Sequence, residues 1–438
     1  MARRVLMDRA AFEAVERADP AWSSVHLAAA MAWCFLMPVG RAPESAAFGV
    51  LAFVAAIRLP STWRLYPALL RSPAFLLLAA LAALHAASAA WATVPTVEPG
   101  TIVQRSILVP FMVWPMVHRL GLLMAALVAG GCVQSAATLL RSWNGAGFDR
   151  YGQSKPLIGH LTTAAMVVST CASVAVAAAA GRRGAWAAAV SGLAIALCLV
   201  ALMVLDVRTS LAAVLPGGIA AVACALPPAG TPGRWRRPIG VTAALALAVA
   251  VTVVASNRTA NWRATLMGQG TPQTAGIDPA FAAAGTRMAA WRGSLEMWRE
   301  NPVLGVGCNS WEFEWKPRIA ADPERYGVPA GRTKLAAMLP GAHNSFLQEL
   351  AERGAVGLAL LLAALGAITA ATWRRRGEWD AAACAAILAV WIFTSLAQSQ
   401  TIQGIPMMLL GVVVARACVP VRPAPPAARP GPRAPANG

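Results

Sequence analysis

Acidic residues are scarce in this chain. Asp and Glu together number 19 among 438 residues. The sequence contains no D-x-D motif, no H-x-x-x-H motif and no tight group of three carboxylates. Because Mg²⁺ and Mn²⁺ are held mainly by carboxylate oxygens, we expect neither a metal site nor a cofactor.

Charge of either sign is also sparse. Charged residues make up 13% of the chain and apolar residues 58%, a balance that excludes a soluble globular protein. Apolar runs of about 17–25 residues recur, and each can cross roughly 30 Å of hydrocarbon. We therefore predict an all-α polytopic membrane protein with about twelve transmembrane helices. The predicted spans are 22–40, 43–59, 73–92, 102–117, 119–140, 156–180, 184–205, 209–226, 237–256, 355–373, 380–398 and 402–418. Pro110 and Pro115 shorten the fourth span, and the sequence LPGG is expected to break the eighth.

The cysteines do not form a framework. Seven of the eight lie in or beside predicted spans, and only Cys308 lies in the large polar segment that precedes the tenth span. No CxxC spacing occurs. This pattern excludes a disulfide scaffold and a cysteine metal site.

The net charge of +18 does not indicate a nucleic-acid-binding protein, because of where the arginines lie. If the N-terminus is cytoplasmic, most arginines fall in inner segments, such as the run Arg374–Arg376, and few fall in short outer loops. This is the positive-inside pattern, and it places both termini in the cytoplasm. The first 20 residues are charged and amphipathic, so we expect the first span to be retained as an anchor.

One polar segment, residues 257–344, breaks the alternation of spans and short loops. Loops of this length translocate regardless of their charge, so we place it on the outer face between spans nine and ten. The predicted organisation is a cytoplasmic N-terminal segment (1–21), spans one to nine (22–256), the outer loop with amphipathic helices (257–344), spans ten to twelve (345–418) and a disordered Pro/Ala-rich cytoplasmic tail (419–438).

Two arginines lie at predicted membrane boundaries. Arg208 interrupts two apolar spans with almost no loop around it, and a charge at membrane depth indicates a functional site. The alternative is an interfacial ion pair with Asp206. Arg105 lies about one turn inside the fourth span, where snorkelling to the interface explains it equally well.

A third arginine opens a predicted amphipathic helix in the outer loop. Met288, Trp291, Leu295 and Trp298 share one face of this helix, which ends at Asn301-Pro302. Tryptophans at this spacing are typical of a helix lying in the membrane interface. Arg287 then stands in the first turn, where a cation opposes the helix dipole. This favours a bound anion nearby, although a solvated arginine is the alternative.

The stretch GAHNSFLQELAERG contains the main candidate for acid–base chemistry. Ser345 is predicted to cap a helix, with Gln348 returning the hydrogen bond, which leaves His343 outside the cap. A histidine that titrates near neutrality suits a general base, whereas a capping or headgroup-binding residue is the alternative. Three weaker candidates for substrate contact are Gln153, Lys155 and Asn344. For the first two, solvated loop residues are the alternative, and Asn344 either orients His343 or fills the position before the cap.

Three of these elements occur in order: Arg208 in a short outer turn, then R…W…NP..GVG from Arg287, then HNSFLQELAERGAVGLALLL running into a span. Together they resemble the bacterial O-antigen ligase/polymerase family. The resemblance covers residues 200–373 at the level of motifs and the whole chain in topology. It implies a GT-C-like fold in the bacterial inner membrane, with the active site under the periplasmic loop.

The resemblance also implies a reaction. The donor is an O-antigen glycan on undecaprenyl pyrophosphate, and the acceptor is a sugar or protein hydroxyl. Among the members we favour O-antigen ligase, with lipid A–core as acceptor; O-antigen polymerase and protein O-oligosaccharyltransferase are alternatives. Membrane lipids are the other expected partner. His343 corresponds to the catalytic histidine, and Arg208 and Arg287 to the arginines that bind pyrophosphate, with Arg105 as support.

The chemistry of these residue types agrees with that reaction. Arginine forks bind phosphate oxygens bidentately and stabilise a pyrophosphate leaving group without a metal. A transporter or flippase for a lipid-linked anion is the alternative from another class. Transporters, however, tend to place charges near the membrane midplane, whereas the candidates here cluster at the outer face.

Overall fold

The computed structural model describes residues 9–94, 107–143, 161–181, 185–205, 207–226, 239–252, 285–329, 333–399 and 404–420. Within these ranges the regular secondary structure is entirely helical. The α-helices are α1 (Arg9–Ala18), α2 (Pro20–Val39), α3 (Arg41–Thr62), α4 (Tyr66–Leu70), α5 (Pro73–Ala87), α7 (Leu120–Trp143), α8 (Leu161–Gly181), α9 (Ala185–Leu205), α10 (Arg208–Cys224), α12 (Thr286–Glu300), α13 (Trp311–Ala321), α14 (Thr333–Ala337), α15 (Ser345–Trp373), α16 (Trp379–Ser395) and α17 (Gly404–Cys418). Short 3₁₀ helices are η1 (Trp63–Leu65), η2 (Ser88–Trp91), η3 (Trp114–Arg119) and η5 (Glu324–Tyr326).

The chain is a polytopic membrane protein. Seven of the described helical stretches are long and apolar enough to cross a membrane, and four shorter apolar helices accompany them. Within the described residues each predicted span overlaps helix, including the segments 107–113 and Ile239–Thr252, and the fourth and fifth predicted spans fall in one helical stretch, Ile107–Trp143. The all-helical class predicted from composition is therefore confirmed.

The expected break at LPGG is wrong. Helix α10 continues through Pro216, Gly217 and Gly218. The missing side chains let neighbouring helices approach closely: Gly217 lies against Ser173 and Val390, and Gly218 against Leu245. Close packing in the bundle thus outweighs the low helix propensity of glycine.

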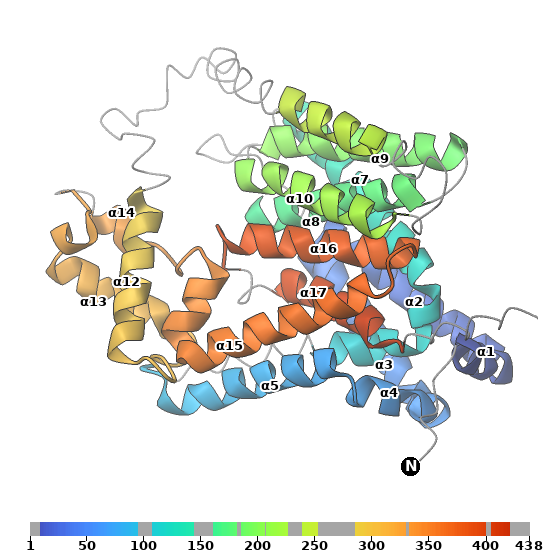
Figure 1. The fold of residues 1–438 in the computed structure, drawn as a ribbon, viewed down its shortest axis with the longest axis horizontal. Helices are drawn as coiled ribbons and strands as arrows, with labels where there is room; N and C mark the ends of the chain where they lie inside the picture. Colours follow the sequence, from blue (N-terminus) through green and yellow to red (C-terminus); the bar gives the residue numbers. More distant parts are fainter. Residues whose placement is uncertain are drawn as a thin grey trace, which may run out of the picture.

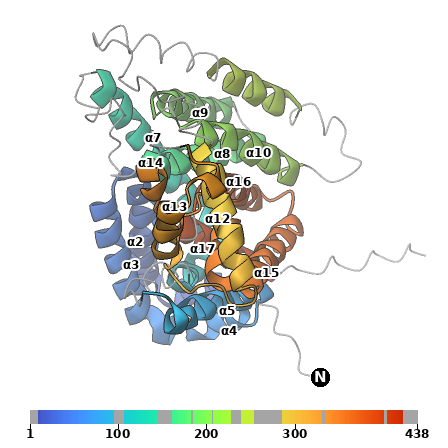
Figure 2. The ribbon, with the colours of Figure 1, turned by 90° about the vertical axis from the view of Figure 1, so that its left-hand side faces the viewer.

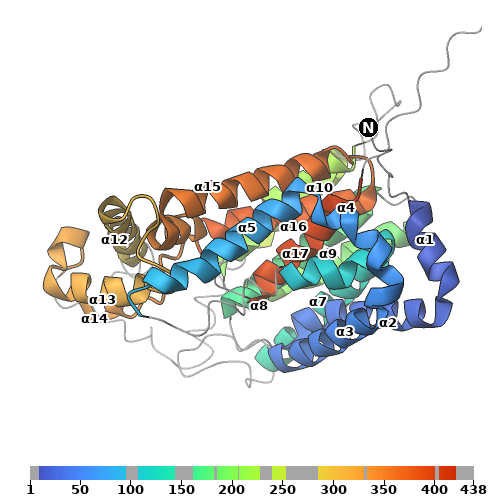
Figure 3. The ribbon, with the colours of Figure 1, turned by 90° about the horizontal axis from the view of Figure 1, so that it is seen from below.

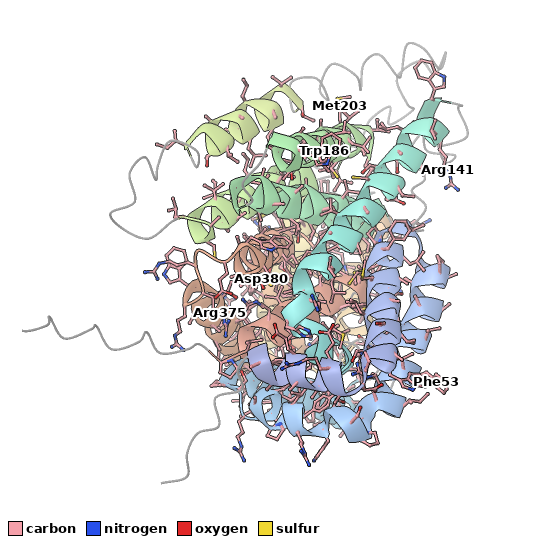
Figure 4. All side chains as sticks on the ribbon, turned by 90° about the vertical axis from the view of Figure 1, so that its right-hand side faces the viewer. Phe53, Arg141, Trp186, Met203, Arg375 and Asp380 are labelled. Atoms are coloured by element: carbon pink, nitrogen blue, oxygen red, sulfur yellow. The ribbon has the colours of Figure 1, made fainter. Side chains whose placement is uncertain are left out.

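The long helices run roughly along one axis and pack side by side (Figures 1 and 3). Helices α12, α13 and α14 lie at one end of this bundle, and α1 lies at the other (Figure 1). We call these the outer end and the inner end. Helix α12 lies across the bundle axis rather than along it (Figures 1 and 2). Phe53, which is 67% exposed, projects from the side of the bundle (Figure 4).

The inner end is tied together by a cluster of charged residues. Arg416 Nε donates to Asp380 Oδ2 at 2.8 Å, and its guanidinium also pairs with Glu378. The backbone N–H of Gly377 donates to the carbonyl of Cys224 at 2.6 Å. This contact joins the C-terminus of α10 to the start of α16, so the two helices run antiparallel. Arg375 and Asp380 lie near one another in Figure 4.

The outer helices have a small core of their own. The rings of Trp311 and Trp315 stack with centroids 5.5 Å apart, and Trp315 also meets Tyr326 edge-on. Gly293 of α12 leaves room for the Trp315 ring. The face of α12 that is buried carries Thr286, Ala289, Ala290, Gly293, Ser294 and Met297. The predicted face of Met288, Trp291, Leu295 and Trp298 lies outside this packing and is exposed or half-buried.

Candidate active site

Helix α15 bends sharply where it meets the outer helices. Gly354 has φ 64° and ψ −161° within an otherwise continuous helix, a backbone region that only glycine occupies readily. A side chain here has no room, because the backbone of Val303 and Leu304 lies within 2.6 Å of where its Cβ stands. The bend therefore depends on glycine twice, for conformation and for space.

The bend frees backbone groups that the loop after α12 then satisfies. Helix α12 ends at its C-cap Asn301, as predicted, and the loop from Pro302 to Gly307 runs along the kink. The bonds are Val306 N–H to Ala351 O (3.0 Å), Gly307 N–H to Glu352 O (2.8 Å), Ala355 N–H to Pro302 O (2.9 Å) and Val356 N–H to Val303 O (3.3 Å). This pairing explains why the motifs NPVLGVG and ERG, which are distant in sequence, both belong to the site.

The outer half of α15 contains a buried network of charges. Arg353 forms ion pairs of 3.1 Å with Glu349 and with Glu352, and its guanidinium donates to Cys308 Sγ at 3.4 Å. His85 of α5 lies 3.0 Å from Glu349. The charged side chains are at most 3% exposed. Buried charges are costly unless they are paired and hydrogen-bonded, and here each ion lies next to an opposite charge or a polar partner.

His343 precedes this network in the chain, two residues before the start of α15. Its φ of 52° makes it one of two non-glycine residues with positive φ among those described. The side chain is half-buried and lies beside that of Gln398. Burial and the positive charge of Arg287 lower the pKa of His343, while the contact with Gln398 opposes the shift. The imidazole is therefore neutral at physiological pH, the form in which it can accept a proton.

The helix cap is one residue earlier than predicted. Asn344 is the N-cap, and its Oδ1 accepts from the N–H groups of Phe346 and Leu347 at 3.0 and 3.1 Å. The predicted cap, Ser345, is instead buried and donates to the carbonyl of Gln398 at 3.0 Å. Asn344 Nδ2 also donates to the carbonyl of Leu396 at 3.2 Å. The prediction of Ser345 as cap is wrong, because Asn is as good a cap as Ser and its position here fits the bend at His343.

Arg287 lies near His343, although it belongs to the first of the outer helices and His343 follows the last of them. It stands in the first turn of α12, is half-buried, and acts electrostatically on His343. No ion pair with another residue in the described ranges occupies its guanidinium. The structure thus brings together two of the three predicted catalytic residues, which are separated by more than fifty positions in the sequence.

Arg208 is the first residue of α10. Because α10 and α16 are antiparallel, the N-terminus of α10 lies toward the C-terminus of α16 at Ser395. The residues that follow, Leu396 and Gln398, hold Asn344 and Ser345. The backbone of Arg208 is therefore directed to the same end of the bundle as His343.

The remaining predicted site residues, Arg105, Gln153 and Lys155, lie outside the described residues, as does Asp206. Asn344 is described only as the helix cap, so its contact with substrate stays a prediction. Within the described part of the chain, no group of three or more His, Cys, Asp or Glu side chains is arranged to hold a metal ion.

Sequence reasoning missed three residues that the structure adds to the site, and it gave a fourth, Gln348, only a capping role beside Ser345, whereas its Oε1 accepts from the N–H of Ala342. Gln398 contacts His343, and Gln348 connects the charged network to the His343 segment. His85 and Glu349 complete the network from two helices. A signal was present for Gln398, because the polar run SLAQSQTIQ interrupts apolar sequence near the outer end of α16. His85 gave none, since its partner is 264 residues away.

Comparison with known families places these features in context. The family described as O-antigen ligase matches the chain over residues 164–362. The matched range contains Arg208, Arg287 and His343 together with the α15 kink. Comparison with curated proteins gives no match.

Proposed function

Residues 164–362 form an O-antigen ligase domain, a domain of enzymes with O-antigen ligase or polymerase activity, and from this premise we propose that the chain is an O-antigen ligase. It transfers O-antigen polysaccharide from undecaprenyl pyrophosphate to a sugar hydroxyl of lipid A–core. The observation that carries the proposal is the position of His343, held with positive φ directly before the Asn344 cap of α15 and within electrostatic reach of Arg287 in the first turn of α12. A cation for the leaving group and a neutral base for the acceptor then lie in one place.

The proposed topology has twelve spans in the bacterial inner membrane, with both termini cytoplasmic and residues 257–344 periplasmic. The ends of the bundle support this orientation. Arginines gather at the inner end, around Arg375 and Arg416, as the positive-inside rule requires. Helix α12 crosses the bundle axis at the other end (Figure 2), which suits a helix lying along the periplasmic membrane surface with its Trp-rich face toward lipid.

The proposed reaction is a single displacement at the anomeric carbon of the donor glycan. The imidazole of His343 takes the proton of the acceptor hydroxyl, and the acceptor oxygen forms its bond to the anomeric carbon. The bond from that carbon to the pyrophosphate oxygen breaks, and its electron pair leaves with undecaprenyl pyrophosphate. Attack opposite the leaving group inverts the anomeric centre.

Arginines neutralise the leaving group in this proposal. Arg208 and Arg287 bind the pyrophosphate oxygens, with Arg105 as support, so the reaction needs no metal. Gln153, Lys155 and Asn344 contact donor or acceptor. Charge-assisted bonds of this kind are about twice as strong as neutral ones, and they gain strength as charge develops on the leaving oxygen.

The test uses the purified protein in nanodiscs with the lipid-linked donor and, separately, lipid A–core, O-antigen repeat or protein as acceptor. His343→Ala and His343→Gln should abolish transfer but retain donor binding, since the arginines remain. Arg208→Lys should lower transfer by roughly tenfold or more, because lysine keeps the charge but loses the fork. Arg299→Lys, an exposed position on α12, serves as the matched control and should behave as wild type.

Each outcome distinguishes between the candidate roles of His343 or between the candidate functions of the chain. Full activity in either His343 variant would remove this residue from catalysis. Transfer to repeat units or protein alone would assign the chain to the polymerase or oligosaccharyltransferase branch. Donor movement across vesicles with no transfer to any acceptor would identify a transporter.

A further inference from the structure

The backbone at His343 needs an external support. A non-glycine residue with φ near 52° is held in the left-handed region, which residues with a side chain populate sparsely. The residue after it, Asn344, is fixed by the helix cap and by its bond to Leu396. The residue before it, Ala342, is fixed by a side chain: its N–H donates to Gln348 Oε1 at 2.8 Å.

Gln348 is oriented by the charged network. Its Nε2 donates to Glu352 Oε1 at 2.6 Å, one turn further along α15. The orientation of the amide follows from its neighbours, because a backbone N–H can only donate and a carboxylate can only accept. Glu352 is in turn fixed by Arg353 at 3.1 Å and by the N–H of Trp311 at 3.4 Å. The buried ions thus determine which atom Gln348 presents to Ala342.

Gln348 also contacts the segment that carries the histidine's partner. Ser399 Oγ donates to Gln348 Oε1 at 3.4 Å, and the side chain of the adjacent residue Gln398 lies beside that of His343. One buried side chain, 2% exposed, therefore contacts both the segment before His343 and the segment that includes Gln398. Loss of this amide removes its contacts to both segments, although Asn344 and Ser345 still bond to Leu396 and Gln398. It removes no group that touches substrate.

We propose that Gln348 is a positioning residue, which transmits the geometry of the buried Glu349–Arg353–Glu352 network to the catalytic imidazole of His343. This inference rests on the proposed function for its effect on turnover, but not for its effect on His343 itself. Misplacement of a catalytic group by about 1 Å can reduce the rate by 10²-fold, so a residue with no substrate contact can still control turnover.

The experiment compares Gln348→Met with wild type in the full-length protein in nanodiscs. Methionine keeps the volume and the helix propensity but removes all three hydrogen bonds, to Ala342, Glu352 and Ser399. The chain has five histidines, so the imidazole of His343 can be assigned by NMR with ring-labelled histidine and the His343→Gln variant. Two quantities are measured: the titration of His343, and kcat and KM with the lipid-linked donor and lipid A–core.

We expect the His343 titration in Gln348→Met to move up toward the ordinary histidine value, because the ring leaves its buried place beside Arg287. With it, kcat should fall by about tenfold or more while KM for the donor changes by less than about threefold. The matched control is Gln134→Met, the same substitution at a buried glutamine of α7 that bonds to Thr138, and it should leave both quantities unchanged.

Two results would overturn the proposal: an unchanged titration with unchanged kcat, or a lower yield of protein whose titration and kcat per folded molecule equal those of wild type. If Gln348→Met does not fold, Ser399→Ala is the second variant, and an unchanged His343 titration there refutes the proposal. If wild type transfers to no acceptor, the proposed function fails, yet the titration still decides whether Gln348 positions His343.

Discussion

The two halves of α15 on either side of Gly354 differ in almost every property. The outer half, Ser345–Arg353, buries Ser345, Gln348, Glu349, Glu352 and Arg353 among other protein groups. The inner half, residues 355–373, contains no charged side chain and no histidine. Its buried residues form a narrow stripe, whereas others such as Leu362 are exposed on the side of the bundle.

This difference shows that the two halves of one helix can lie in different surroundings, one in lipid and the other in protein. The inner half follows the rule for a membrane span, with apolar groups toward lipid. The outer half is buried in protein at the same end as His343, where polar groups are allowed if they satisfy one another. The kink is the boundary, because it turns the outer half under the loop from Pro302 to Gly307.

The largest expected effect is on stability, from removing the cation of the outer half. Arg353→Met leaves Glu349 and Glu352 buried without their counter-charge, which should cost about 3–5 kcal/mol of unfolding free energy. Arg374→Met, at the exposed inner end of the same helix, should cost less than about 0.5 kcal/mol. Thermal unfolding of both variants in detergent measures the difference. Equal stability would mean that the network contributes nothing to the fold.

The next largest effect is expected on transfer activity, from substitution of Gly354 at the kink. Gly354→Ala should lower transfer by at least about tenfold, because alanine strains this backbone region and displaces the loop at Val303. Gly366→Ala, in the inner half, is the matched control, since nothing lies within 4 Å of an added Cβ there. Its activity should equal that of wild type. Transfer assays on equal amounts of folded protein make the comparison, and similar losses in both variants would refute a special role for the kink.

The pH dependence of transfer should come from the titration of His343, which lies on the outer side of the kink at Gly354. Burial and Arg287 lower the pKa of His343, and a base must be deprotonated to act. The plot of kcat/KM against pH should therefore stay flat through the ordinary histidine value of about 6.5 and fall only at lower pH. In Arg287→Met the fall should begin at higher pH, since one cause of the lowered pKa is gone. An acidic limb at the same pH in both proteins would contradict this assignment.

The smallest expected effect is that of chelation. The carboxylates of the outer half are already paired with Arg353 and Gln348, so they are not open to a cation. EDTA should leave the rate of transfer unchanged, measured before and after dialysis. A loss that only Mg²⁺ or Mn²⁺ restores would contradict arginine-based stabilisation of the leaving group.

Part of this architecture could be predicted from the sequence. The inner half of α15 and the other apolar helices were predicted from their hydropathy, because a helix that crosses a bilayer needs apolar residues along its whole length. The helix after Arg287 and its end at Asn301 followed from local signals that act within a few residues. His343 was identified as a residue outside the cap even though the cap was assigned to Ser345 rather than Asn344.

The rest depends on contacts between distant segments. In sequence, the outer half of α15 resembles an ordinary amphipathic helix. Only the contacts of its charged residues with His85 and Cys308 in the structure show that these charges are buried. Likewise, the continuity of α10 through LPGG depends on Ser173, Val390 and Leu245, which lie on three other elements. Local propensity does not contain this information.

The pairing of His85 with Glu349 has a consequence for how the protein is made. The two residues are 264 positions apart, and at a synthesis rate of about 5–20 residues per second, roughly 10 to 50 seconds pass between them. During that interval the imidazole of His85 in α5 is without the carboxylate of Glu349, because α15 has not yet been synthesised. His85 therefore gains its carboxylate partner only after the start of α15 has been made, so the buried network is among the last contacts of the bundle to form.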